Sequence, residues 1–306
     1  MSMPQRPLRL GTRASPLAMA QAYLVRDALC AAHGWAQEAI TLCPVTASGD
    51  KILDRALAEV GGKALWTKEL DEWLFEGHVD FSVHSMKDVE TIRPAELLIA
   101  AMLPRADVRD KLVGAESLDA LPQGARIGTS SPRRQAQVLA MRPDFQISLF
   151  RGNVNTRLAK LAAGEVDATL LAAAGLDRLD MSDVGVALEQ DVLLPAPSQG
   201  AIGIECRSDD AETRALLATI ADAPTMQAVA AERAFLAALT ADCRSPVAAQ
   251  ARITEGGIAL KGQILLPDGS ETQAGEALLA APEDGATLAA TLLDRASPAL
   301  RAYFGQ

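Results

Sequence analysis

The sequence predicts two α/β lobes followed by a smaller α+β domain, and three observations carry this prediction. Short apolar strands alternate with helical patterns as far as about residue 206. A strand–Gly-Thr–Ser-Pro–helix pattern occurs twice, at Leu10–Pro16 and again at Ile127–Pro132. After Pro224 three strand-like runs follow one another instead of alternating with helices. We expect lobe one at 1–103 plus 199–220, lobe two at 104–198 and the third domain at 221–306.

The first lobe begins with a strand over Leu8–Thr12. Ser15 and Pro16 then start a helix that ends at Gly34. Its predicted apolar face is Leu17, Ala20, Leu24, Ala28 and Ala31. Further elements are strands at Ile40–Val45, Val79–Val83 and Leu97–Ala101 and a helix over Thr67–Glu76. The polar, glycine-rich residues 47–63 predict a mobile loop that could cover a site.

The second lobe has predicted strands at 111–113, 126–129, 146–150 and 168–172 and helices at 132–141 and 154–163. A strand over Ala201–Cys206 returns to lobe one. In the third domain a helix over Met226–Leu239 precedes strands at 247–253, 258–266 and 271–277 and a final helix over Asp284–Ala296.

Composition excludes several function classes. A net charge of -10 leaves no broad basic surface, and 4% aromatic residues provide few stacking platforms, so nucleic acid is not an expected partner. The 4 cysteines contain no Cys-x-x-Cys pair and there are only 3 histidines, so we expect free thiols and no structural metal site. No apolar run is long enough to cross a bilayer, and arginines interrupt the N-terminus. These features favour a cytoplasmic protein.

The stretch from Arg126 to Arg157 holds six arginines and one acid, Asp144. Arg133 and Arg134 fall in the first turn of the helix that Ser131 starts, where the helix dipole disfavours cations. We therefore expect an anion beside these helix starts. A second strand ends at Arg151-Gly152-Asn153, and the helix that follows carries Arg157. The alternative is a solvated charged face.

Two further residues could do chemistry. Asp88 follows a strand, where α/β sheets place their ligands, and its carboxylate could act as a base or stabilise a cation. The alternative for Asp88 is helix capping. Cys243 lies in a predicted turn and could be a nucleophile, although Asp242 would oppose thiolate formation. The alternative for any free cysteine is a small buried hydrophobe, which is our expectation for Cys30, Cys43 and Cys206. We expect His84 to be a structural hydrogen-bonding residue.

Six motifs in order resemble the porphobilinogen deaminase family, the hydroxymethylbilane synthases, over essentially the whole chain. They are Arg13-Ala14-Ser15-Pro16-Leu17-Ala18, Val60-Gly61-Gly62-Lys63, His84-Ser85-Met86-Lys87-Asp88-Val89, Gly128-Thr129-Ser130-Ser131 with Arg133-Arg134-Gln135, Arg151-Gly152-Asn153-Val154, and Cys243 with Pro246. The resemblance implies two lobes like type II periplasmic binding proteins and a cofactor-attachment domain with a three-stranded antiparallel sheet. It also implies a transferase of tetrapyrrole and heme biosynthesis, which we expect to be a monomer.

The implied reaction links four porphobilinogen molecules head to tail, with release of ammonia, into linear hydroxymethylbilane. The chain grows on a dipyrromethane cofactor held by a thioether, which would be attached to Cys243, while Asp88 would be the catalytic residue. The implied cofactor-binding residues are Ser15, Ser85, Lys87, Asp88, Thr129, Ser130, Ser131, Arg133, Arg134, Arg151 and Gly152. The implied substrate-binding residues are Arg13, Ser15, Lys63, Arg151, Asn153, Arg157, Arg178 and Gln199. Arginine suits this task because it binds carboxylates through two parallel hydrogen bonds.

Several positions depart from the family pattern. Ala241-Asp242 replaces a usual Gly-Gly before the cysteine, Ser198 replaces a usual Gly, Pro132 a usual Leu and Trp66 a common Phe. Two other functions share some of these features. A solute-binding or effector-sensing module would use the lobes and arginines without Asp88 or Cys243. A thiol acyltransferase would use Cys243 but needs an activating histidine, which the sequence does not show.

Overall fold

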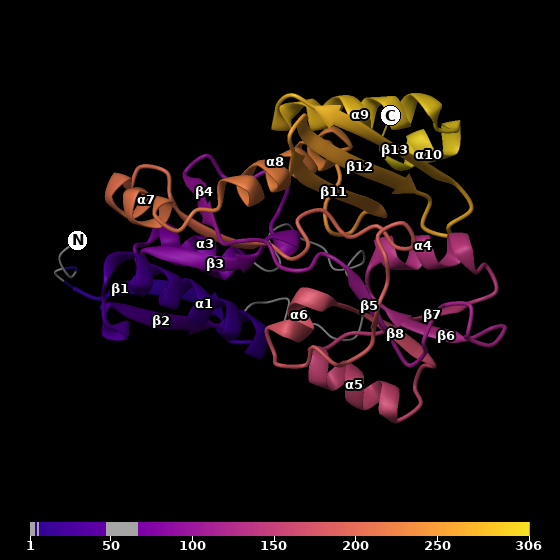
Figure 1. Cartoon of the computed structure of the whole chain (residues 1–306), viewed down its shortest axis with the longest axis horizontal. Helices are drawn as coiled ribbons and strands as arrows, with labels where there is room; N and C mark the ends of the chain where they lie inside the picture. The colour runs from indigo at the N-terminus through magenta and orange to yellow at the C-terminus, as the bar shows by residue number, and fades with distance from the viewer. Residues whose placement is uncertain (1–3, 5, 47–66, 306) are drawn as a thin grey trace. The chain divides into compact units, whose positions relative to one another are not determined.

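The computed structural model describes residues 4, 6–46 and 67–305, and it divides into two compact units (Figure 1). Of the described residues, unit 1 contains those up to 106 together with 200–226, and unit 2 contains 107–199 and 227–305. The predicted loop at 47–63, with Lys63, and Trp66 lie outside the described residues. No helix in the described part of the chain has both the length and the apolar character that a bilayer crossing needs.

Unit 1 is built on a five-stranded sheet in the order β2-β1-β3-β10-β4. Its strands are β1 (Leu8–Arg13), β2 (Ile40–Val45), β3 (Phe81–Ser85), β4 (Leu97–Met102) and β10 (Ile202–Arg207). Strand β1 runs parallel to β2 and β3, whereas β10 is antiparallel to β3 and β4. The helices are α1 (Pro16–His33), α3 (Lys68–Phe75) and α7 (Ala211–Ala218), with short 3-10 helices η1 (Gln37–Ala39) and η3 (Met86–Asp88).

Helix α1 begins and ends where its sequence predicts. Ser15 accepts a hydrogen bond from the Ala18 N–H, and Gly34 ends the helix in a left-handed conformation with φ 67°. The predicted buried face is wrong, because Leu24 is 47% exposed and Ala31 is exposed. The buried apolar residues of the helix are Ala18, Ala22, Val25, Leu29 and Cys30. Because this helix is apolar on more than one face, periodicity could not choose between them.

The first part of unit 2 is a second five-stranded sheet, in the order β7-β6-β8-β5-β9. Its strands are β5 (Asp110–Val113), β6 (Arg126–Thr129), β7 (Gln146–Leu149), β8 (Ala168–Ala172) and β9 (Val186–Ala187). Helices α4 (Pro132–Met141), α5 (Val154–Ala162) and α6 (Ala173–Asp177) connect them. Strand β6 is parallel to β7 and β8, and β5 is antiparallel to β8 and β9.

The two sheets share one plan, which the repeated sequence pattern predicted. In each, a strand between two parallel neighbours (β1 or β6) leads through a Ser-Pro helix start into α1 or α4. In each, one antiparallel strand lies next to the parallel strands, β10 in unit 1 and β5 in unit 2. Strand β5 follows the passage of the chain from unit 1 to unit 2, and β10 follows its return. The return of residues 202–207 to the first sheet is therefore confirmed.

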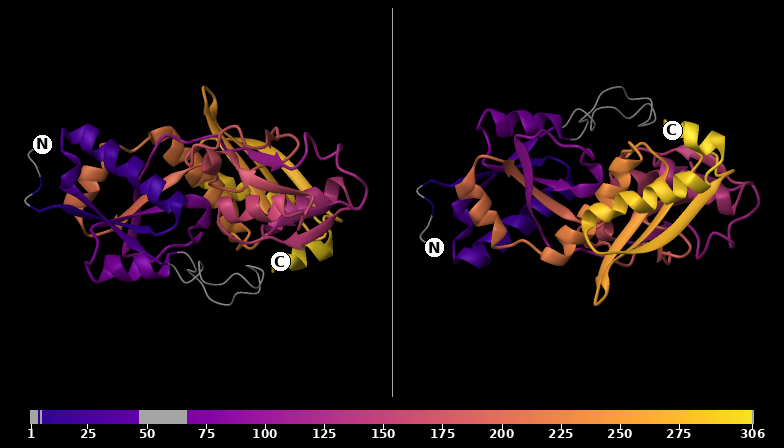
Figure 2. Two further views of the ribbon diagram at one scale, coloured as in Figure 1. Left: turned by 90° about the horizontal axis from the view of Figure 1, so that it is seen from below. Right: turned by 90° about the horizontal axis from the view of Figure 1, so that it is seen from above.

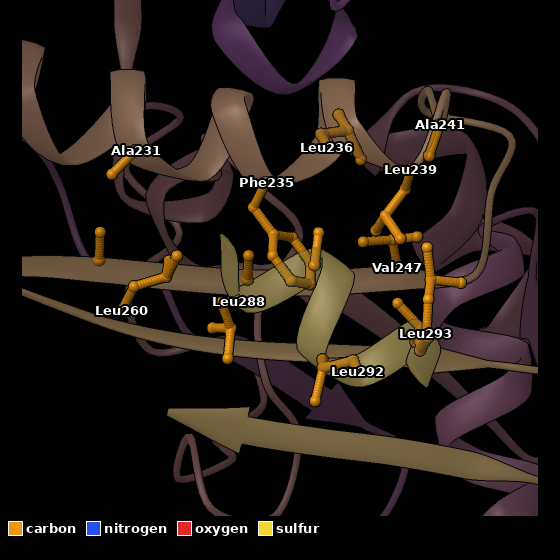
Figure 3. Close-up of a cluster of buried hydrophobic side chains, with 14 of the residues drawn as sticks. Ala231, Phe235, Leu236, Leu239, Ala241, Val247, Leu260, Leu288, Leu292 and Leu293 are labelled. Atoms are coloured by element: carbon orange, nitrogen blue, oxygen red, sulfur yellow. The ribbon is translucent and has the colours of Figure 1, made fainter. Parts of the chain in front are cut away.

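The second part of unit 2 is a three-stranded antiparallel sheet of β11 (Val247–Thr254), β12 (Gly257–Leu265) and β13 (Thr272–Leu279). Helix α8 (Ala223–Ala238) precedes it, and η4 (Pro282–Asp284), α9 (Gly285–Arg295) and α10 (Pro298–Tyr303) follow. Helix α9 lies along one face of the sheet (Figure 2). Phe235, Leu260, Leu288 and Leu292 meet in the core beneath it (Figure 3). The sequence did not predict α6, α7 or α10, which are too short to show a clear period.

Candidate functional site

Unit 1 has an open pocket at the carboxyl ends of β1 and β3. Four residues expected from the sequence line it, namely Arg13, Ser15, Ser85 and Asp88. The carboxyl ends of neighbouring parallel strands meet at one edge of a sheet, which is where α/β folds place their ligands. The start of α1 also borders the pocket, because Ser15 is the residue that caps it. The helix start and Arg13 together favour an anionic ligand.

Asp88 ends the short helix η3 and is half-buried in this pocket. Within the described part of the chain its carboxylate makes no hydrogen bond or ion pair with another residue. It is not a helix cap, so the alternative reading of this residue does not hold. A carboxylate in this position can interact with a ligand without first breaking an internal ion pair. Lys87, its neighbour in η3, is half-buried as well.

The pocket also contains residues that sequence reasoning did not select. Gln21 of α1 exchanges hydrogen bonds with Ser85: its amide nitrogen donates to the hydroxyl at 2.8 Å, and its carbonyl lies 3.2 Å from the same oxygen. This pair fixes Ser85 at the end of β3. Thr67 and His84 line the pocket too. The sequence held a signal for Gln21, because a glutamine occurs early in both Ser-Pro helices, as Gln21 and Gln135.

His84 contacts a buried carboxylate, that of Glu205. Its Nε2 lies 2.8 Å from the Ser82 hydroxyl and 3.2 Å from Glu205 Oε2. Burial acts to raise the pKa of Glu205, but hydrogen bonds and charges from His84 and Arg93 outweigh it and lower the pKa to about 2. His84 is thus a structural hydrogen-bonding residue, as expected.

In unit 2 the hydroxyl residues between β6 and α4 organise the chain there. The Thr129 hydroxyl accepts a hydrogen bond from the Ser131 N–H at 3.1 Å, and Ser131 caps α4 by accepting from the Arg134 N–H. Ser130 donates to the Phe150 carbonyl at 2.8 Å, which links the ends of β6 and β7. The next turn requires Gly152, with φ 120°, because a Cβ there would lie 2.8 Å from Thr156.

Arg133 and Arg134 have a protein carboxylate between them. Arg133 Nη2 donates to Asp110 Oδ2 at 2.7 Å, and Arg134 Nη2 donates to Asp110 Oδ1 at 2.6 Å. All three side chains are buried. Burial lowers the pKa of Arg133, and the charge of Asp110 opposes that shift. Their position at the helix start therefore does not by itself require an external anion, because Asp110 of β5, more than twenty residues away in the sequence, compensates both cations.

Four other arginines lie between residues 126 and 157, two in ion pairs and two after β7. Arg126 and Arg142 form ion pairs with Asp167 and Asp144 at the surface. Arg151 is buried at the end of β7, and Arg157 on α5 donates from Nε to the Gly152 carbonyl at 2.9 Å. Asn153 caps α5 by accepting from the Thr156 N–H at 2.9 Å.

Arg178 and Gln199 occupy different environments. Arg178 directly follows α6, and burial lowers its pKa to about 10 although Asp177 opposes the shift. An anion bound beside this guanidinium would favour its charged form. Gln199 is buried, and its amide nitrogen donates to the Val108 carbonyl at 2.8 Å and to Asp110 Oδ1 at 3.0 Å. Gln199 therefore supports the Asp110 carboxylate.

Cys243 is exposed and lies in the turn before β11, as predicted. The turn is closed by the Ser245 N–H, which donates to the Asp242 carbonyl at 3.0 Å. Arg244 donates to Asp242 Oδ2 from Nε at 2.9 Å, so the charge that would oppose a thiolate is compensated. Neither Ala241 nor Asp242 is left-handed; the positive φ in this loop, 52°, belongs to Thr240.

Cys30 and Cys206 are buried, in line with our expectation, whereas Cys43 is partly exposed.

Known families match almost the whole chain. The family model "Porphobilinogen deaminase, dipyromethane cofactor binding domain" matches residues 8–215, and "Porphobilinogen deaminase, C-terminal domain" matches 226–294. A porphobilinogen deaminase from Sphingopyxis alaskensis is 58% identical over 99% of this chain and 98% of its own length. The one from Paracoccus denitrificans is 49% identical over 95% of this chain and 94% of its own length.

Among solved structures, the second substrate binding domain of a putative amino acid ABC transporter from Streptococcus pneumoniae is 10% identical, covers 70% of this chain and 90% of its own, and has a TM-score of 0.42. The strand order of the two sheets supports the assignment of two related α/β lobes independently of this likeness. The family models extend through both lobes and the C-terminal sheet, which excludes a simple solute-binding module. The chain belongs to the porphobilinogen deaminase family.

Proposed function

We propose that this chain is a hydroxymethylbilane synthase, which condenses four porphobilinogen molecules head to tail and releases ammonia at each addition. The observation that carries the proposal is the match to both porphobilinogen deaminase domains across residues 8–294, with Asp88 placed in a pocket beside Arg13 and Ser15. The activity is a transferase step of tetrapyrrole biosynthesis. We further propose the three-domain division given above, a monomer, and a location in the cytoplasm.

The residues of unit 2 fit a dipyrromethane cofactor attached to Cys243. The thiol is exposed in a turn, and the neighbouring Asp242 is paired with Arg244, so thioether formation is not opposed by a free negative charge. The Nε atoms of Arg133 and Arg134 are buried and make no hydrogen bond in the described structure. Unsatisfied donors on two cations suit a ligand that carries carboxylates. When bound, the dipyrromethane supplies the pyrrole to which the first substrate is joined.

In unit 1, we assign proton transfer and charge stabilisation to Asp88. Among the described residues no side chain pairs with the Asp88 carboxylate, so it can stabilise a pyrrole cation and accept its proton. Arg13 and the Ser15 helix start bind the carboxylates of the substrate in the same pocket. Ser85, held by Gln21, and Lys87 add donors at the end of β3.

In unit 2, we assign cofactor binding to the residues that follow β6 and β7, namely Thr129, Ser130, Ser131, Arg133, Arg134, Arg151 and Gly152. Growing chains gain two carboxylates with each pyrrole, so additional cations are needed as synthesis proceeds. We assign this task to Arg151, Arg157 and Arg178, with Asn153, Gln199 and Lys63 as further substrate-binding residues. The lowered pKa of Arg178 supports its assignment to substrate binding, because a bound carboxylate would offset the cost of burying the guanidinium.

The test uses the full chain purified after expression. It should consume porphobilinogen, release ammonia and form hydroxymethylbilane, and its intact mass should exceed the mass of the polypeptide by one dipyrromethane. Cys243→Ser should lack both the added mass and the activity, because a neutral hydroxyl is a far weaker nucleophile than a thiol. Cys43→Ser, at a partly exposed cysteine outside the site, is the control and should retain both. Catalysis by protein that never carries an adduct would refute the assignment.

A further inference from the structure

The segment that carries Lys87 and Asp88 has little regular structure of its own. It leaves the sheet after Ser85, forms the single turn of η3, and then runs without helix or strand until β4 begins at Leu97. Its position therefore depends on the contacts that attach it to the rest of unit 1. Pro94 restricts the backbone of the residue before it, Arg93, to extended conformations.

Arg93 is the main attachment at the far end of this segment. Its side chain is 9% exposed and donates to three acids and one hydroxyl. Nε and Nη2 donate to the two oxygens of Glu205, each at 2.9 Å. Nη2 also donates to Asp71 Oδ1 at 2.5 Å, and Nη1 donates to Glu90 Oε2 at 2.6 Å and to the Thr67 hydroxyl at 3.2 Å. Arg93 thus joins the segment to α3 and to β10.

The Glu205 carboxylate also contacts the beginning of the segment. Glu205 Oε2 lies 3.2 Å from His84 Nε2, so one buried side chain contacts residues 84 and 93, which flank Asp88. A register shift in β10 occurs between Ile204 and Glu205. Such bulges re-aim a side chain and are common beside active sites. His84 and Thr67 line the Asp88 pocket, so the network and the pocket share two residues.

A third attachment lies between these ends. Met86 is buried, its N–H donates to the Ala201 carbonyl at 3.1 Å, and its side chain packs so closely on Gly203 that a Cβ there would be 2.1 Å from the sulfur. Met86 fixes the start of η3, whereas Arg93 ties the end of the segment to Glu205 and Asp71. Without Arg93, the part of the segment that follows Asp88 would lose its hydrogen bonds to Glu205 of β10 and Asp71 of α3.

We propose that Arg93 is a positioning residue for catalysis, which holds the Asp88 carboxylate in its working position by tying the segment 84–93 to Glu205 and Asp71. The proposal deepens the proposed function, because it rests on Asp88 as the catalytic residue. A displacement of about 1 Å in a catalytic group can cost up to ~10²-fold in rate. Loss of Arg93 should therefore lower kcat more than it raises KM, because the carboxylate-binding residues Arg13 and Ser15 lie on other elements.

The test is a double-mutant cycle on the full-length enzyme carrying its cofactor. We expect Arg93→Met to lower kcat by roughly 10- to 100-fold in the wild-type background. In the Asp88→Asn background the same change should alter the remaining rate less than about twofold, because residues that act as a unit are not additive. Arg93→Lys, which keeps the charge but not the planar fork, should have an intermediate kcat and provides an answer if Arg93→Met does not fold.

Two measurements separate positioning from general stability. Arg126→Met removes an arginine from a partly exposed ion pair in unit 2 and should leave kcat unchanged. Intact mass should show that every variant carries the cofactor. An equal loss of kcat from Arg93→Met in both backgrounds, or a wild-type kcat in Arg93→Met and Arg93→Lys, would overturn the positioning role. An inactive wild-type chain would instead refute the proposed function.

Discussion

Asp110 provides a direct test of how unit 2 holds its two adjacent arginines. Its carboxylate is fully buried and accepts from Arg133 at 2.7 Å and from Arg134 at 2.6 Å. In Asp110→Asn one carboxylate oxygen becomes an NH₂ group, which cannot accept a hydrogen bond. One guanidinium would lose one of its acceptors, and both would lose the only negative charge that the described structure places between them.

The expected cost is large because the cations stay buried. Breaking one side of a buried ion pair typically costs about 3–5 kcal/mol, since the remaining charge is uncompensated. In a protein of this size about 1 kcal/mol shifts the midpoint by roughly 2–4 °C, so Tm should fall on the order of 10 °C. We also expect less cofactor on the purified variant, because Arg133 and Arg134 are among the residues proposed to bind it.

Thermal unfolding followed by circular dichroism, together with intact mass, would measure both effects. The matched control is Asp191→Asn, which breaks the ion pair with Lys261 where Asp191 is 85% exposed. That variant should unfold close to wild type, because exposed pairs contribute little. If Asp110→Asn and Asp191→Asn had the same Tm, the buried carboxylate would not be what stabilises the arginine pair.

Three further predictions follow from single residues. Asp88→Asn should keep the fold and the cofactor but lose about 10²–10³-fold in turnover, and near-wild-type bilane formation would remove Asp88 from the mechanism. Ser198→Gly should raise the free energy of unfolding by up to about 1 kcal/mol in denaturant titrations, because Ser198 has φ 65°; a lower stability would contradict this reading. Glu205 has a pKa of about 2 in the fold against 4.5 as the ordinary value, so its stabilising effect is present above pH 4.5 and is lost as pH falls toward 2. Between pH 4.5 and 2 the free energy of unfolding should therefore fall less steeply in Glu205→Gln than in wild type. Equal slopes against pH would argue against the pairing of Glu205 with His84 and Arg93.

Features that depend on neighbouring residues could be predicted from the sequence. Ser15 and Ser131 cap their helices, and Gly34 ends the first one, because caps involve only three or four consecutive residues. Asp88 at the end of a strand and Cys243 in a turn follow from the same local reasoning. The repeated start of the two lobes also predicted the shared plan of their sheets.

Features that depend on burial and distant partners were decided only by the tertiary structure. The sequence shows arginines at 133 and 134 but not that Asp110, on another strand, lies between them. It shows an apolar helix at 16–33 but not which side faces the sheet. Glu205 contacts residues more than a hundred positions away, and only the folded sheet brings it to His84 and Arg93. A charge is stabilised by whatever lies within a few ångströms in space, and chain order does not determine that distance until the sheets have formed.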